Sequence, residues 1–338
     1  PGEPRPPGAA RPATAAGRGR RVRPWLVRVV FLAVVVGCMV WSLDGRWDEV
    51  AHAVRRVHPL ALVAAVLLTC VGLLATSVVW RRTLAAFGHE VPPREARSVF
   101  FVSQLGKYVP GAVWAIGVQA KLAARHAVPV RVTVTTALMF TAIHLLTAGL
   151  LGGVLVATGA APAPGPRWLW GIGALGCVVG LVPAVTRWVL RKAAGTDLVV
   201  GWRDPLGVVV LMGVAWASYA VALLLLVEDR SLSSLAALAG AFALGYVAGV
   251  LVVVAPAGLG AREATFVAVL SPATGLPVAT AIALLARIVH TVADVLLAAA
   301  SWRPARAADP VGAGGSSPTD PELSVAAGTV RCHDDDRL

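Results

Sequence analysis

Two short stretches combine a basic side chain with helix-breaking residues inside otherwise apolar sequence. The first, SQLGKYVPGAVW at residues 103–114, places Lys107 among glycines and a proline. The second, APAGLGARE at residues 255–263, places Arg262 and Glu263 directly after a proline and two glycines. A helix that starts beside a glycine turn presents unpaired N–H donors and a positive dipole end, to which a lysine or arginine adds full charge. The chemistry indicated is capture of an anionic group.

The sequence around these stretches is that of an integral membrane protein. Of 338 residues, 57% are apolar and 14% are charged, and several apolar runs exceed the roughly 20 residues that cross a bilayer as a helix. The net charge of +12 would suggest nucleic acid as the partner of a soluble domain. Because the basic residues cluster between apolar runs, we expect an anionic membrane lipid as partner instead, and no nucleic acid.

Seven apolar runs predict an all-α, polytopic bundle with about seven full spans. They are Trp25–Leu43, Pro59–Trp80, Val132–Thr158, Trp168–Thr186, Leu206–Val227, Leu232–Ala255 and approximately Val278–Trp302. The first run follows a basic segment, as in a signal peptide, but no small-x-small cleavage site follows it, so we expect a retained span with a cytoplasmic N-terminus.

The remaining sequence divides into three parts. Residues 1–24 are rich in Pro, Ala, Gly and Arg and predict a disordered basic arm on the cytoplasmic side. Residues 25–302 form the predicted transmembrane domain. Residues 303–338 are polar and predict a disordered tail.

The two stretches that contain the helix-breaking motifs, residues 98–120 and 255–277, do not have the pattern of ordinary spans. They are the two broken pieces of the transmembrane domain. If the first piece dips into the membrane and returns, the basic residues of the following loops stay on the cytoplasmic side, as the positive-inside rule prefers. For the second piece the rule does not decide between crossing the membrane and returning to the same side. Arg262 favours one of these answers, while Arg303 and Arg306 favour the other. Both pieces are expected to be re-entrant.

Interrupted helices at membrane depth are tolerated only where protein or water covers the freed backbone groups. A pair of such segments in the two halves of a membrane protein is a pointer to a transport site. Gln104 could add a neutral hydrogen bond, and Tyr108 and Trp114 could lie at head-group level. The alternative is that Lys107 and Arg262 snorkel at loop edges and the glycines serve close packing.

The last predicted helix carries ionisable residues on one face. Arg287, His290 and Asp294 are spaced i, i+3 and i+7, and charges at that depth normally face a polar interior and pair with each other. Two interpretations stay open: a structural clamp between Arg287 and Asp294, or a polar wall in which Asp294 or Glu263 balances Lys107 or Arg262. His144 predicts interhelical contact or, alternatively, a proton relay.

The motifs QLGKYVPGAVW and APAGLGAREA, followed by LLARIVHTVADVLLA, resemble the lysylphosphatidylglycerol synthase transmembrane-region family. The resemblance implies a flippase-like module, which in two-domain synthases moves aminoacylated phosphatidylglycerol between leaflets. It also implies that stand-alone members serve cell-envelope assembly, some with polyprenyl-linked sugars. The soluble aminoacyl-transferase domain of the synthases has no counterpart here, so we expect no lysyl transfer.

The family motifs map onto a defined set of positions. They are Gln104, Gly106, Lys107, Pro110, Gly111 and Trp114 in the first motif and Pro256, Gly258, Gly260, Arg262 and Glu263 in the second. Tyr108, Arg287, His290 and Asp294 complete the predicted substrate-binding set.

The sequence therefore predicts a non-enzymatic protein of the bacterial cytoplasmic membrane that binds and translocates an anionic lipid, either a phospholipid or a polyprenyl-linked glycan. We expect no metal and no cofactor, because the four cysteines lack ligand spacing and no nucleotide-binding loop is present. Three alternatives stay open: an accessory subunit of a glycosyltransferase or envelope-assembly complex, a secondary transporter of a soluble anion, and an enzyme acting on lipid head groups.

Overall fold

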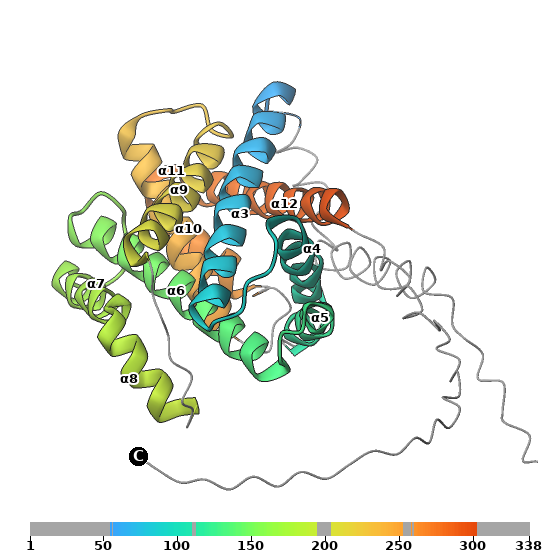
Figure 1. Ribbon diagram of the computed structural model, residues 1–338. Helices are drawn as coiled ribbons and strands as arrows, with labels where there is room; N and C mark the ends of the chain where they lie inside the picture. The colour runs from blue at the N-terminus through green and yellow to red at the C-terminus, as the bar shows by residue number, and fades with distance from the viewer. Residues whose placement is uncertain are drawn as a thin grey trace, which may run out of the picture. The chain divides into compact units, whose positions relative to one another are not determined.

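The computed structural model describes residues 55, 57–109, 113–194, 204–252, 258 and 260–302, and within these ranges every regular element is a helix (Figure 1). In chain order the elements are α3 (Pro59–Ala86), α4 (Pro93–Gln104), η1 (Leu105–Tyr108), α5 (Val113–Ala123), η2 (Ala124–His126), α6 (Val130–Ala157), α7 (Arg167–Leu181), α8 (Pro183–Ala194), α9 (Pro205–Leu224), α10 (Leu232–Leu251), α11 (Ala261–Thr274) and α12 (Leu276–Ser301).

Among the described helices, α3, α6, α9, α10 and α12 are long and apolar enough to cross a bilayer, and the bent pair of α7 and α8 would make a sixth span. With 20 to 28 residues each, these five helices reach roughly 30 to 42 Å at a rise of about 1.5 Å per residue. The chain is thus a multi-pass membrane protein, and its described part is all-helical. The predicted first span at residues 25–43 and both predicted tails lie outside the described residues.

The predicted span at Trp168–Thr186 is not one continuous helix, because α7 and the start of α8 occupy this stretch. Whether the bent pair crosses the membrane as one span stays a prediction. Helix α7 ends at Leu181, Val182 is extended, and the chain turns by 77° into α8. The cause is Pro183, whose ring forces the preceding residue out of the helical conformation and which has no N–H to continue the helix. In the predicted span Leu232–Ala255, helix α10 ends at Leu251, and residues 253–255 lie outside the described residues.

The long helices form the core. Helix α3 packs against α9 and α12, while α6 packs against α7 and α10. Small residues allow these approaches: a Cβ added at Gly72 of α3 would lie 2.4 Å from the Tyr219 ring of α9, and one at Gly152 of α6 would lie 2.7 Å from Leu244 of α10. Gly152 belongs to the glycine-rich run of residues 149–159, and small residues of this kind allow helix backbones to approach closely.

The first broken piece is interrupted as its sequence predicts. Helices α4 and α5 contain 12 and 11 residues, so each is about 18 Å long or less and too short to cross the hydrocarbon core. The turn η1 follows α4 directly, and α4 and α5 pack against each other (Figure 1). Whether the pair enters the membrane from one side stays a prediction.

The second broken piece turns at glycines. Gly258 and Gly260 have φ values of +69° and +82°, and α11 begins at Ala261. The end of α10 lies close by, since a Cβ added at Gly258 would lie 2.5 Å from the Cα of Gly249. Gly258 is therefore required both for its left-handed backbone and for this backbone contact.

Replacing Gly258 should cost more stability than replacing a glycine that has the same backbone handedness but free space around it. Gly88 is that control, because its φ is +81° and nothing lies within 4 Å of an added Cβ. Gly88→Ala should lower the midpoint of thermal unfolding in detergent by about 2–4 °C, from backbone strain alone. Gly258→Ala should lower it by about twice as much or more, because the backbones of the two segments must also separate. Equal effects of the two substitutions would show that the contact between Gly258 and Gly249 does not hold the second break in place.

Candidate functional site

Lys107 lies in the turn between α4 and α5. The turn can form because residue 106 is glycine: a Cβ there would lie 2.7 Å from the backbone N and Cα of Ala115, at the start of α5. The two short helices can thus approach each other directly behind the lysine. The glycine of the motif has a packing role, whereas Lys107 provides the charge.

The carboxylate of Asp294, on α12, holds this turn. Asp294 Oδ2 lies 2.6 Å from Lys107 Nζ and accepts a hydrogen bond of 2.6 Å from the hydroxyl of Tyr108. The Tyr108 hydroxyl also lies 3.3 Å from Thr291 Oγ1. The Asp294 side chain is 2% exposed while that of Lys107 is 34% exposed. The buried acid is therefore paired with a cation whose other side remains open.

The second oxygen of Asp294, Oδ1, is buried and has no hydrogen-bond partner among the described residues. All the donors that reach this carboxylate come to Oδ2, from Lys107 and Tyr108. Tyr108 is itself buried, with 6% exposure, and its hydroxyl contributes to holding Asp294. Its expected place at head-group level stays a prediction. Trp114 is 55% exposed, and its position relative to head groups stays a prediction.

Glu263 makes two contacts at the start of α11. Its Oε2 accepts a hydrogen bond of 2.8 Å from the backbone N–H of Gly260, and its Oε1 pairs with Nη1 of Arg287 on α12. A carboxylate that accepts from the backbone at a helix start satisfies an N–H that the helix leaves unpaired. Because the two side chains are only 13% and 11% exposed, this ion pair is largely shielded from solvent.

The predicted clamp between Arg287 and Asp294 is not formed. Seven residues along a helix correspond to about 10.5 Å of rise, which keeps the two charged groups apart even though they share a face. Each pairs with a different broken segment, Asp294 with Lys107 and Arg287 with Glu263. The sequence predicts that Asp294 or Glu263 balances the charge of Lys107 or Arg262. Of these possible ion pairs, the structure contains the one between Asp294 and Lys107.

Arg262 is the cation that remains without a carboxylate among the described residues. Its guanidinium carbon lies 4.7 Å from the centre of the Phe242 ring of α10, a cation–π arrangement. Close approach of α10 is possible because Gly245 and Gly249 face the start of α11; a Cβ at Gly249 would lie 3.2 Å from Arg262 Cβ. Two anions and three cations thus gather around α12, and the excess positive charge is on Arg262.

His290 lies within an aromatic layer rather than in the ion pairs. Its Nδ1 faces the carbonyl oxygen of Ala286 at 3.0 Å, and its ring lies 4.7 Å from that of Phe242 and 5.0 Å from that of Tyr219. Its Nε2 has no hydrogen-bond partner within the described ranges. His290 therefore contacts the same phenylalanine as Arg262.

His144 belongs to the same layer. Its ring stacks on Tyr246 at 4.4 Å and meets Trp216 at 5.1 Å. Its contacts are those of interhelical packing, and the alternative of a proton relay is untested. Sequence reasoning missed the layer's members on α9 and α10, although the pairs Trp216 with Tyr219 and Phe242 with Tyr246 repeat at i, i+3 and i, i+4 inside apolar spans.

The other predicted residues are distributed as follows. Gln104 is half-buried at the end of α4, and it is Gln119 of α5 that donates to Ser103 of α4, at 3.3 Å. Pro110, Gly111 and Pro256 lie outside the described residues. No group of three or more His, Cys, Asp or Glu side chains that could hold a metal occurs within the described ranges.

The pair of Glu263 and Arg287 should be strongly coupled in stability. Arg287→Met leaves a shielded carboxylate without its counter-charge, which should cost about 3–5 kcal/mol. The double variant with Glu263→Gln removes both charges and should unfold at a higher temperature than Arg287→Met alone. Thermal unfolding of the two single variants and the double variant in detergent measures this. Additive losses in the double variant would contradict the coupling.

Comparison with known proteins identifies the family of the chain. None of the curated proteins searched matches the chain. The family model for the lysylphosphatidylglycerol synthase TM region matches residues 25–298, which include both broken segments and nearly all of α12. The chain belongs to the lysylphosphatidylglycerol synthase transmembrane-region family.

Proposed function

We propose that this protein binds the head group of an anionic lipid at Lys107 and Arg262 and moves that lipid across the bacterial cytoplasmic membrane, without catalysing a reaction. The observation that carries the proposal is the unbalanced charge at the two broken segments. Arg262 has no carboxylate partner among the described residues, and Lys107 is paired on one side and open on the other. A phosphate-type anion fits both groups.

Binding would work by exchange at Lys107. In the structure the lysine is occupied by Asp294, which is also held by the Tyr108 hydroxyl. An arriving head group would replace the carboxylate at Nζ, while Tyr108 keeps Asp294 in place for its return. When no lipid is bound, Asp294 would keep Lys107 paired, because an unpaired cation at membrane depth costs free energy. Asp294 would also release the lipid by competing for the lysine.

The described helices suggest how the rest of the lipid would be accommodated. Helices α4 and α5 are short and are linked to α12 through Lys107 and Tyr108, so the turn between them can expose a polar slot while the acyl chains stay in the bilayer. No nucleotide-binding loop occurs in the sequence, and the proposal takes an ion gradient, a lipid gradient or a partner protein as the energy source. The N-terminus is proposed to be cytoplasmic.

Neutralising either cation should abolish translocation. The full chain is reconstituted in phosphatidylcholine vesicles that contain a trace of fluorescent phosphatidylglycerol, and dithionite quenching reports how much of the probe changes leaflet. Lys107→Gln and Arg262→Gln should each reduce the protein-dependent rate by about 100-fold, because losing a charge-assisted contact costs about 1.5–3 kcal/mol per hydrogen bond and the head group makes more than one. Lys121→Gln and Arg125→Gln are matched controls, since both residues are exposed and should leave the rate unchanged.

Three outcomes would count against the proposal. The first is unchanged movement of the probe in both charge variants. The second is wild-type protein that moves neither fluorescent phosphatidylglycerol nor a polyprenyl phosphate, which would favour an accessory role in an envelope-assembly complex. The third is wild-type protein that moves no lipid but takes up glycerol phosphate into sealed vesicles, which would favour a soluble-anion transporter.

Asp294→Asn should separate binding from release. Removing the resident anion leaves Lys107 with no competitor, so the purified variant should retain at least about fivefold more phosphatidylglycerol than wild type. Its translocation rate should nevertheless fall, because the lipid is no longer displaced. Thin-layer or mass-spectrometric quantification of lipid that co-purifies from vesicles of known composition measures retention. Retention at or below the wild-type level in a folded variant would contradict exchange at Lys107.

A further inference from the structure

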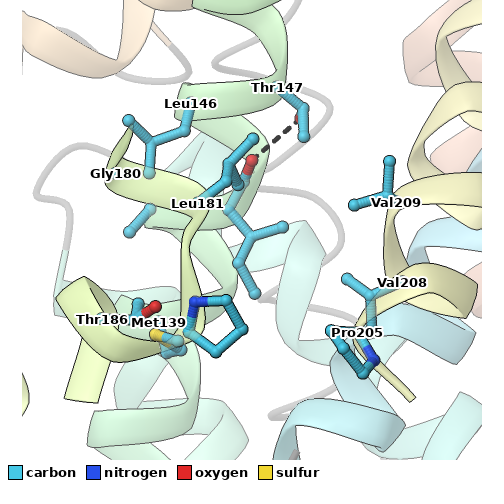
Figure 2. A pocket seen from close by; sticks show the side chains of 12 residues that line it. Met139, Leu146, Thr147, Gly180, Leu181, Thr186, Pro205, Val208 and Val209 are labelled. Carbon is cyan, nitrogen blue, oxygen red and sulfur yellow. Dashed lines mark hydrogen bonds between the residues drawn. The ribbon is translucent and has the colours of Figure 1, made fainter. Parts of the chain in front are cut away.

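A second, apolar site lies away from the charged segments. A pocket with a cavity volume of about 50 Å³, open on one side, is bounded by α6, by the bend between α7 and α8, and by the start of α9. Figure 2 shows Gly180 and Leu181 on one wall facing Val208 and Val209 on the other. The space exists because α7 packs on α6 while α9 packs on α3 and α10, and the 77° bend at Pro183 turns the chain before α7 and α8 can form one straight helix.

The side chains that line this pocket have almost no polar groups free to bind a ligand. Its two hydroxyl groups already donate to backbone carbonyl oxygens four residues earlier in the chain: Thr147 to Ile143, a bond of 2.9 Å that Figure 2 shows, and Thr186 to Val182 at 2.9 Å. Thr147 Oγ1 also accepts from Nε1 of Trp216 at 3.1 Å. A stable water needs two to four polar partners. The pocket therefore suits hydrocarbon and disfavours water or a charged solute.

The walls of the pocket continue into exposed apolar surfaces. Val209 lines the pocket and is also 49% exposed. On α7 the large apolar side chains Ile172, Leu175 and Val179 are exposed, and Ala174 is the buried hydrophobic residue of that helix. Because α7 and α9 belong to segments apolar enough to span the membrane, the hydrocarbon beside these faces is that of the lipids. A chain from the bilayer can enter sideways with no loss of hydration.

We propose that this pocket holds one acyl chain of a membrane phospholipid, wedged between the α7–α8 bend and α9. If this apolar pocket were empty, the side chains that line it would lose dispersion contacts, and the acyl chains of the bilayer are the apolar groups that can restore them. The bound chain fills the gap left by the bend and supports α7 against α9.

This site is independent of the proposed lipid translocation. The hydrogen bond between Thr147 and Trp216 lies behind the pocket, and Trp216 contacts Phe242, the ring on which Arg262 rests. Protein side chains thus separate the pocket from the cation. The lipid whose chain fills the pocket need not be the lipid whose head group is moved.

Photo-crosslinking with a filled-pocket variant tests the proposal. The full chain is placed in phosphatidylcholine vesicles that contain a phospholipid with a diazirine near the end of one acyl chain, and crosslinked peptides are mapped by mass spectrometry. In wild type, crosslinks should appear on residues 139–147 and 180–186. Gly180→Leu points a side chain toward Leu146, whose flexible end lies 3.0 Å from an added Cβ. It should reduce these crosslinks about tenfold.

The same helix provides the control. Gly173 of α7 has nothing within 4 Å of an added Cβ, so Gly173→Leu should leave the pocket crosslinks unchanged. Ala142→Phe fills the pocket from α6 and should reproduce the loss if Gly180→Leu folds poorly. Lys107→Gln should crosslink as wild type does, which separates this site from the proposed translocation.

Several results would overturn the assignment. Wild-type crosslinks that avoid both predicted peptides would do so, as would pocket crosslinks that persist in both filled variants. Displacement of the phospholipid probe by an equal amount of polyprenyl phosphate would overturn the phospholipid assignment in favour of an isoprenoid chain.

Discussion

A charge that is shielded from solvent needs an opposite charge beside it, and α12 supplies the partners for both broken segments. Asp294 pairs with Lys107 of the first segment, and Arg287 pairs with Glu263 of the second. The two pairs lie about two turns apart on one helix, so α12 sets the spacing of the segments. The cation outside this pairing, Arg262, rests on Phe242. The same arrangement that stabilises the breaks thereby leaves one positive group without a carboxylate among the described residues.

The glycines of the two broken segments determine where the charged side chains of these segments lie. Gly106 lets the start of α5 pass behind Lys107, and Gly258 lets the turn before α11 meet the end of α10. A side chain at either position would move the nearby cation together with its helix. The aromatic layer of His144, Trp216 and their neighbours then fills the space between α6, α9, α10 and α12. Within each motif the glycines allow close packing, and the lysine or arginine provides the charge.

The sequence predicted the helical class, five of the spans and the first break correctly, because apolar run length and clustered Gly and Pro depend on local chemistry. It placed a single helix across Val182, where Pro183 forces a bend. It also favoured neither outcome for Asp294. Periodicity puts Arg287 and Asp294 on one face, but the choice of partner depends on which distant segment packs there, which one sequence does not contain. The burial of Tyr108 was missed for the same reason.

The most direct test is a cryo-electron microscopy structure of the full chain in nanodiscs that contain phosphatidylglycerol. The account predicts density for a head-group phosphate within hydrogen-bonding distance of Lys107 Nζ, with Asp294 displaced from the lysine and still bonded to Tyr108. A map in which lipid is present around the protein, while the pair of Lys107 and Asp294 stays closed and no phosphate approaches Arg262, would contradict it.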